Sequence, residues 1–111
     1  MIKIRASQIN GCAYCIDMHT QEALEIGETQ RRIFALSAWK ESPLFTEEER
    51  VVLQLTEEVT LISKDGGSDD TYDKVINAYG KNGLAQLIMQ IIIINSWNRI
   101  AVSTKQVFGI M

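Results

Sequence analysis

This chain of 111 residues has little of what marks several protein classes. It contains one proline and almost none of the apolar–polar alternation that is typical of strands, so helices should dominate its fold. It has no run of lysine and arginine and its net charge is −3, which argues against a nucleic-acid partner. Two cysteines are too few for the disulfide framework of a small secreted domain.

The sequence also lacks the usual signals for entering a membrane. The N-terminal residues have no apolar core and no cleavage site of small residues, so we expect no signal peptide and a cytoplasmic protein. The most apolar stretch, residues 84–94, is interrupted by Gln86 and Gln90 and is too short to span a bilayer. We interpret it as part of a buried helix and expect no membrane partner.

What is present fits one folded domain. Hydrophobic residues make up 46% of the chain, which is enough for a core that needs neither metal nor disulfide staples. No internal repeat, low-complexity tract or linker divides the sequence. We therefore expect a single all-α domain over residues 1–111, built from about five helices.

Capping residues and apolar spacing place the first two helices. Asn10 can cap a helix that runs through both cysteines and ends at Gly27. A second helix should span about 29–40, before the break at Pro43. Residues 1–9, ahead of these helices, read as either the end of a helix or an extended lead-in.

Three further helices follow. Thr46 and Glu49 stand as N-cap and N3 of a capping box, which opens a helix that reaches Ile62. After a glycine-rich loop at 64–68, a fourth helix should end at Gly80. The last helix should run from about 84 towards 105.

The chemistry is concentrated in residues 12–19, which hold both cysteines and the only histidine. On a helix, Cys12, Cys15 and His19 project from nearly the same side, because each residue turns the helix by about 100°. A cysteine pair at i, i+3 has Cα atoms about 5 Å apart, which is within disulfide range. The helix N-terminus also favours thiolate over thiol.

His19 lies one turn after Cys15, where a base can take the thiol proton directly or through a water molecule. We therefore assign Cys15 as the attacking thiolate and Cys12 as the resolving thiol. A zinc site using Cys12, Cys15 and His19 is an alternative, although it needs a fourth ligand and no other Cys or His exists. A buried pair of cysteines without function is the other alternative.

The segment from Ser7 to Thr20, SQINGCAYCIDMHT, together with residues 39–47 and 95–99, resembles the carboxymuconolactone decarboxylase-like superfamily, in its alkylhydroperoxidase D-like branch. This resemblance covers nearly the whole chain. It implies an all-α fold that assembles as dimers, trimers or hexamers. It also implies peroxide reduction by a CxxC pair with no metal or organic cofactor, with the second cysteine peroxidatic, the first resolving and a downstream histidine in a proton relay.

The chain departs from the family pattern at two places. The relay glutamate that usually stands about a dozen residues before the first cysteine is missing, and Tyr14 replaces a histidine between the cysteines. Tyr14 can donate a hydrogen bond, and Glu22 could orient His19 in place of the missing glutamate. Glu57 or Glu58 could reach the site from the third helix. The Trp97–Asn98–Arg99 run is interpreted as packing and subunit contacts, with a site-lining role second.

We therefore expect a thiol-dependent antioxidant enzyme, a peroxidase that reduces hydrogen or organic peroxides with an external dithiol as reductant. One alternative is a lyase that decarboxylates a lactone, for which a CxxC pair has no evident use. The other is a non-enzymatic thiol redox switch whose disulfide controls assembly.

Overall fold

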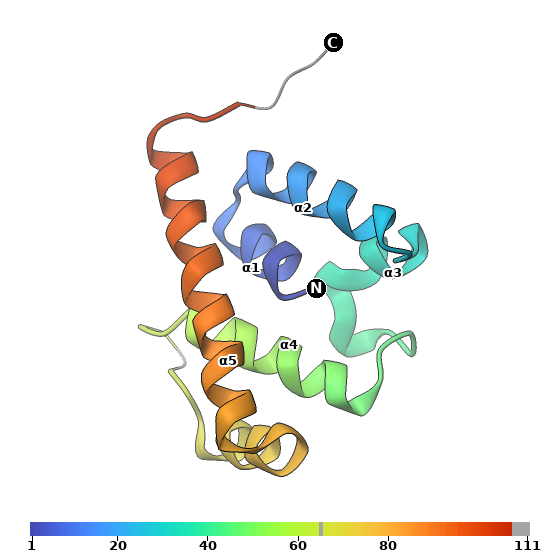
Figure 1. Ribbon diagram of the computed structural model, residues 1–111, viewed down its shortest axis with the longest axis vertical. Helices are drawn as coiled ribbons and strands as arrows, with labels where there is room; N and C mark the ends of the chain where they lie inside the picture. The colour runs from blue at the N-terminus through green and yellow to red at the C-terminus, as the bar shows by residue number, and fades with distance from the viewer. Residues whose placement is uncertain (65, 108–111) are drawn as a thin grey trace.

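The computed structural model describes residues 1–64 and 66–107, and within these residues every regular element is helical. Asp65, inside the predicted loop, and residues 108–111, at the end of the predicted domain, lie outside the described part. The expected all-α fold is confirmed (Figure 1). None of the described helices is long and apolar enough to cross a membrane.

The N-terminal residues form a helix, α1 (Ile2–Asn10), which contacts α2 (Ala13–Glu25), α4 (Glu47–Thr60) and α5 (Asp69–Ser103). Figure 1 shows α1 enclosed by these three helices. Of the two readings of residues 1–9, the helical one is therefore correct, and it makes α1 the central element of the fold. Its buried residues Ile2 and Ala6 belong to one core cluster with residues of α4 and α5.

The second predicted helix is shorter than expected. α3 covers Gln30–Ala35, with Thr29 as its N-cap, and a 3₁₀ helix, η1, continues from Leu36 to Glu41. Ala38 leaves helical geometry (φ −125°, ψ 36°). The guanidinium of Arg50 on α4 donates hydrogen bonds to three carbonyl oxygens in this region, those of Trp39, Lys40 and Ser42. These contacts satisfy carbonyl groups that a continued α-helix would have used internally.

The predicted capping box opens α4 as expected. Thr46 accepts from the Glu49 N–H, and the Glu49 carboxylate accepts from the Thr46 N–H. Ser68 caps the first turn of α5 by accepting from the Thr71 N–H. α5 changes direction at Gly80 (φ 73°, ψ 178°), so the predicted end of the fourth helix is the break between the two arms of α5. Its C-terminal arm passes alongside α1 to the start of α2.

Candidate functional site

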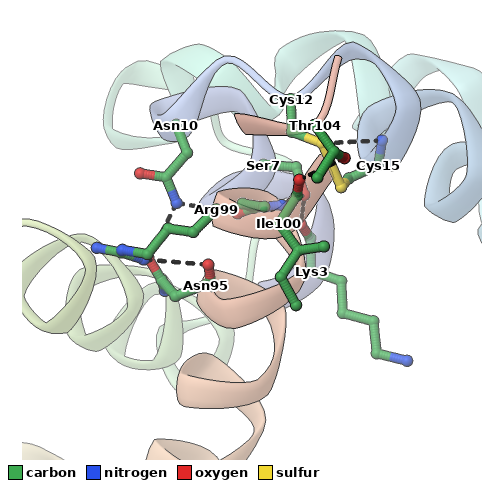
Figure 2. The surroundings of a disulfide bond; sticks show 10 residues. Lys3, Ser7, Asn10, Cys12, Cys15, Asn95, Arg99, Ile100 and Thr104 are labelled. Atoms are coloured by element: carbon green, nitrogen blue, oxygen red, sulfur yellow. Dashed lines mark hydrogen bonds between the residues drawn. A yellow bond between two sulfur atoms is a disulfide. The ribbon is translucent and has the colours of Figure 1, made fainter. Parts of the chain in front are cut away.

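Cys12 and Cys15 are joined by a disulfide, with their Cα atoms 5.3 Å apart. This confirms that the pair lies within disulfide range. Both residues are almost fully buried, at 1% and 2% exposure, and Ala101 near the C-terminal end of α5 packs in the same cluster. Figure 2 shows the disulfide between the start of α2 and the last turns of α5. A reactant can therefore reach the sulfur atoms only through the small part of the two cysteines that the described fold leaves exposed.

Cys12, and not Asn10, is the N-cap of α2. Its backbone is extended (φ −89°, ψ 96°), and its sulfur atom accepts a hydrogen bond from the Cys15 N–H at 3.2 Å. The predicted cap at Asn10 was wrong because Asn10 is still the last residue of α1. The Asn-Gly pair ends one helix here instead of starting the next.

The junction between α1 and α2 contains no separate linker. Gly11 adopts a left-handed conformation (φ 68°, ψ 34°), its N–H donates to the Gln8 carbonyl, and the Cys12 N–H donates to the Ser7 carbonyl. These two bonds form a Schellman motif, the usual end of a helix at glycine. Cys12 thus completes the C-terminal motif of α1 and at the same time caps α2. The sulfur atom is held at the positive end of the α2 dipole.

Asn10 contributes to the site through its side chain. Its amide donates to the side-chain Oδ1 atoms of Asn95 and Asn98, both at 2.9 Å (Figure 2 shows Asn10 and Asn95). Asn98 donates in turn to the Ser7 hydroxyl at 3.0 Å. Arg99 donates to the Asn95 side chain. A polar network therefore joins α5 to the end of α1 that carries the disulfide.

His19 is nearly buried, with 10% of its side chain exposed, and its Nδ1 contacts the Glu22 carboxylate at 2.7 Å. Glu22 itself is 57% exposed. This contact occupies Nδ1 and leaves Nε2 as the nitrogen for proton exchange. Among the described residues, no hydrogen bond joins His19 to either sulfur atom, so the histidine stands one turn behind Cys15 without direct contact.

A shallow groove of about 310 Å³ lies beside His19. It is lined by side chains from α1, α2 and α5, namely Lys3, Tyr14, Met18, His19, Ile93, Ile94 and Trp97. Tyr14 also packs against the cysteine cluster. The groove thus reaches Tyr14 and His19 along mainly apolar side chains, and Tyr14 separates it from the cysteines, neither of which lines it.

The two other glutamates considered from the sequence lie elsewhere. Glu57 accepts from Arg5 and from the Trp39 indole N–H. Glu58 accepts from the Ser68 N–H and the Thr71 hydroxyl. Neither carboxylate reaches the cysteines.

Sequence reasoning missed the parts that Ser7 and Asn10 play, and it interpreted Asn98 first as a packing or subunit contact, with a site-lining role second. The available signal was a pair of asparagines three residues apart in an otherwise apolar helix, since such amides need buried partners. Within the part of the chain that the structure describes, no three His, Cys, Asp or Glu side chains cluster in a way that could hold a metal ion.

Comparisons with known proteins agree with this arrangement. The model of the carboxymuconolactone decarboxylase family matches residues 1–58, which include α1, α2 and both cysteines. The uncharacterised protein YdfG of Bacillus subtilis is 46% identical over 103 residues, which cover 93% of this chain and 70% of that protein. The uncharacterised protein YnjA of Escherichia coli is 30% identical over 57 residues, or 51% of this chain and 31% of that protein.

A solved structure has nearly the same fold. It is a protein from Agrobacterium tumefaciens described as of unknown function and assigned provisionally to the antioxidant defence protein AhpD. The TM-score is 0.96 at 38% identity, and the match covers 99% of this chain and 75% of that one.

Proposed function

Since the chain belongs to the carboxymuconolactone decarboxylase family, with an AhpD-like fold, we propose that it is a thiol-dependent peroxidase. The observation that carries the proposal is the Cys12–Cys15 disulfide at the N-terminus of α2. A dithiol at this position gains reactivity from the helix and closes to a disulfide with little backbone movement. The substrates we propose are hydrogen peroxide and organic hydroperoxides, with an external dithiol as reductant.

In the proposed cycle, the Cys15 thiolate attacks the terminal oxygen of a hydroperoxide. The O–O bond breaks, the alkoxide takes a proton and leaves as an alcohol, and Cys15 becomes a sulfenic acid. The Cys12 thiolate then attacks the Cys15 sulfur, and hydroxide takes a proton and leaves as water. An external dithiol reduces the disulfide in two exchange steps and is itself oxidised to a disulfide. The cycle uses no metal or organic cofactor.

His19 is proposed as the proton relay for Cys15. Its Nε2 is the free nitrogen, and the contact of Glu22 with Nδ1 fixes the orientation of the ring. A proton passing between Cys15 and His19 needs a bridging water, since no direct contact exists among the described residues. Tyr14, half-buried against the cysteines, supplies a phenol that can donate a hydrogen bond to the leaving oxygen.

The two alternative functions use the site less well. Lactone decarboxylation, the lyase alternative, gives no role to a dithiol at a helix N-terminus. A non-enzymatic redox switch would use the disulfide but has no need of a carboxylate-oriented histidine beside it. Both predict the absence of peroxide turnover, so one assay separates them from the peroxidase.

We also propose that the chain acts as a homo-oligomer, whether a dimer, trimer or hexamer. Four large apolar side chains recur every three or four residues on α5 and are about half exposed: Met89, Ile93, Trp97 and Ile100. Exposed apolar faces of this kind are typical of protein interfaces. Since Ile93 and Trp97 also line the groove beside His19, a second copy on this face would help to enclose the site.

The decisive assay supplies the purified protein with cumene hydroperoxide and dithiothreitol and follows peroxide loss. We expect turnover in the wild type and none in Cys15→Ser. Cys12→Ser should oxidise once and hold a sulfenic acid at Cys15 that dimedone traps. The absence of peroxide loss in the wild type would exclude the peroxidase, and full turnover in both variants would exclude the assigned roles.

The relay is tested by the rate of thiol alkylation near neutral pH in the reduced protein. His19→Gln should slow the reaction of Cys15, because the base that takes its proton is missing. Gln21→Ala, an exposed change on the same helix, serves as the control. Equal rates in His19→Gln and the control would remove His19 from the mechanism.

A further inference from the structure

Asn98 is a buried amide near the C-terminal end of α5, and its side chain forms hydrogen bonds with two residues of α1. It is 1% exposed. Its Nδ2 donates to the Ser7 hydroxyl at 3.0 Å, and its Oδ1 accepts from the Asn10 amide at 2.9 Å. A buried polar group of this kind costs free energy unless its partners are in place, so its contacts hold the facing groups in one arrangement.

The groups that Asn98 holds are those that end α1. Ser7 is fully buried, and its carbonyl accepts from the Cys12 N–H at 3.0 Å, while Asn10 directly precedes the turn at Gly11. The amide of Asn98 therefore contacts two side chains within the Schellman motif, both on the helical side of Gly11. Its contacts fix the point at which the chain leaves α1.

The backbone N–H, the carbonyl and the sulfur of Cys12 each take part in a hydrogen bond. The N–H donates to the Ser7 carbonyl, the carbonyl accepts from the Ile16 N–H at 2.9 Å, and the sulfur accepts from the Cys15 N–H at 3.2 Å. When the disulfide is reduced, a Cys12 thiolate in this position meets a backbone N–H donor and the positive end of α2. Displacement of the Cys12 backbone would turn the sulfur away from this N–H donor and from the positive end of α2.

We infer that Asn98 is a positioning residue, which acts through Ser7 and Asn10 to hold Cys12 as the N-cap of α2 and thereby stabilises the Cys12 thiolate. This inference rests on the proposed redox role of the pair. In that cycle the Cys12 thiolate attacks the sulfenic acid and later leaves when the disulfide is reduced. A stabilised thiolate is the better leaving group, and its larger thiolate fraction speeds the attack as long as the thiol pKa lies above the ambient pH.

Asn95 does not take the same role. Its Nδ2 donates to the Thr60 hydroxyl at 3.0 Å and to the Ile91 carbonyl, and its Oδ1 accepts from Arg99 and from Asn10. Asn95 thus shares Asn10 with Asn98, but its other bonds go to α4 and to its own helix, and none goes to Ser7. Thr60 offers a matched control, because Thr60→Val removes a buried hydrogen bond of the same network on the side away from Ser7.

The ionisable groups around the sulfur are unchanged in the variants compared. Figure 2 draws Lys3 from α1 and Arg99 from α5 in the surroundings of the disulfide. On α2, Tyr14 packs against the cysteine cluster and His19 follows. A difference between Asn98→Leu and Thr60→Val therefore reports the placement of Cys12 and not a change in nearby charge.

The test is a titration of Cys12 in a Cys15→Ser background, where only one thiol remains and the backbone N–H of residue 15 is retained. The ultraviolet absorbance of the thiolate is followed against pH in the otherwise unchanged protein and with Asn98→Leu, Ser7→Ala or Thr60→Val. Asn98→Leu should move the midpoint to higher pH and lower the ratio of thiolate to thiol near neutrality about fivefold, the effect of losing one helix cap. Thr60→Val should leave the midpoint in place.

An unchanged midpoint in folded Asn98→Leu, or an equal shift in Thr60→Val, would overturn the inference. If circular dichroism shows that Asn98→Leu does not fold, Ser7→Ala decides, since it removes the acceptor of the same bond: a shift supports the inference and no shift overturns it. The titration uses no peroxide. A protein that lacks peroxide turnover but shows the shift would refute the proposed function alone.

Discussion

Glu58 offers a quantitative test of how the fold holds α5 in place. This α4 side chain is 5% exposed, and its carboxylate accepts from the Ser68 N–H at 2.7 Å, the Thr71 hydroxyl at 2.5 Å and the Gln54 amide at 2.8 Å. Burial by itself would raise the pKa of Glu58, but these hydrogen bonds outweigh burial and hold the pKa below its ordinary value. The charged carboxylate therefore holds Ser68, just before α5, and Thr71, in the first turn of α5.

Glu58→Gln keeps the shape of the side chain and removes the charge. The new amide also places a donor against the Gln54 amide donor. Hydrogen bonds to charged groups contribute about 1.5–3 kcal/mol each, so the loss of one such bond should lower the free energy of unfolding by about 2 kcal/mol. For a domain of this size, that corresponds to a fall in Tm of about 10 °C.

The assay is thermal unfolding at several pH values. The control is Glu48→Gln, an exposed change on the same helix, whose free energy of unfolding should stay within about 0.5 kcal/mol of wild type. Because the pKa of Glu58 is lowered in the folded state, its stabilisation is complete above about pH 4.3 and is lost as the pH falls through the folded value. The difference between wild type and Glu58→Gln should therefore shrink in acid. A Tm for Glu58→Gln within one degree of wild type at neutral pH, or a difference that persists at acid pH, would refute this reasoning.

Three further predictions concern caps and the exposed face of α5. Gly11→Ala should lower the free energy of unfolding, measured in urea, by about 1 kcal/mol, because the left-handed backbone is strained for alanine. No atom lies within 4 Å of the added Cβ, so strain alone should cause the loss, and a neutral effect would contradict the φ of 68°. Thr46→Ala should lower the free energy of unfolding in the same assay by about 1 kcal/mol, because the capping box is lost. Stability equal to that of wild type would mean that the box contributes nothing. Trp97→Lys should lower the apparent mass in size-exclusion chromatography, whereas Ile26→Lys, at another exposed apolar position, should not; an unchanged elution volume for Trp97→Lys would place the interface elsewhere.

Local signals predicted most of the helix boundaries correctly. The Thr46–Glu49 capping box and the break at Gly80 both depend on residues within one turn of each other, so the sequence contains the whole of each signal. The Asn10-Gly11 pair shows where such signals are ambiguous. An asparagine before glycine suits either a helix start or a helix end, and only the packing of α1 decides between them.

The surroundings of the cysteines were less predictable, because their determinants are far apart in the sequence. The bond between Asn98 and Ser7 spans 91 residues, and that between Asn10 and Asn95 spans 85. The pairing of the cysteines followed from their spacing of three, and the contact between His19 and Glu22 follows from the same helical spacing. The network that positions Cys12 instead required the path of α5 across α1.

The same contacts between α1 and α5 bear on the order in which the protein folds. During synthesis, the segment that carries both thiols emerges before α5, and Ala101, which covers them, is added about 90 residues later. Contacts of such long sequence separation form late, since they close a large loop. The nascent chain therefore exposes a reactive dithiol until α5 docks, so the sulfur atoms become shielded only after the contacts between α1 and α5 have formed.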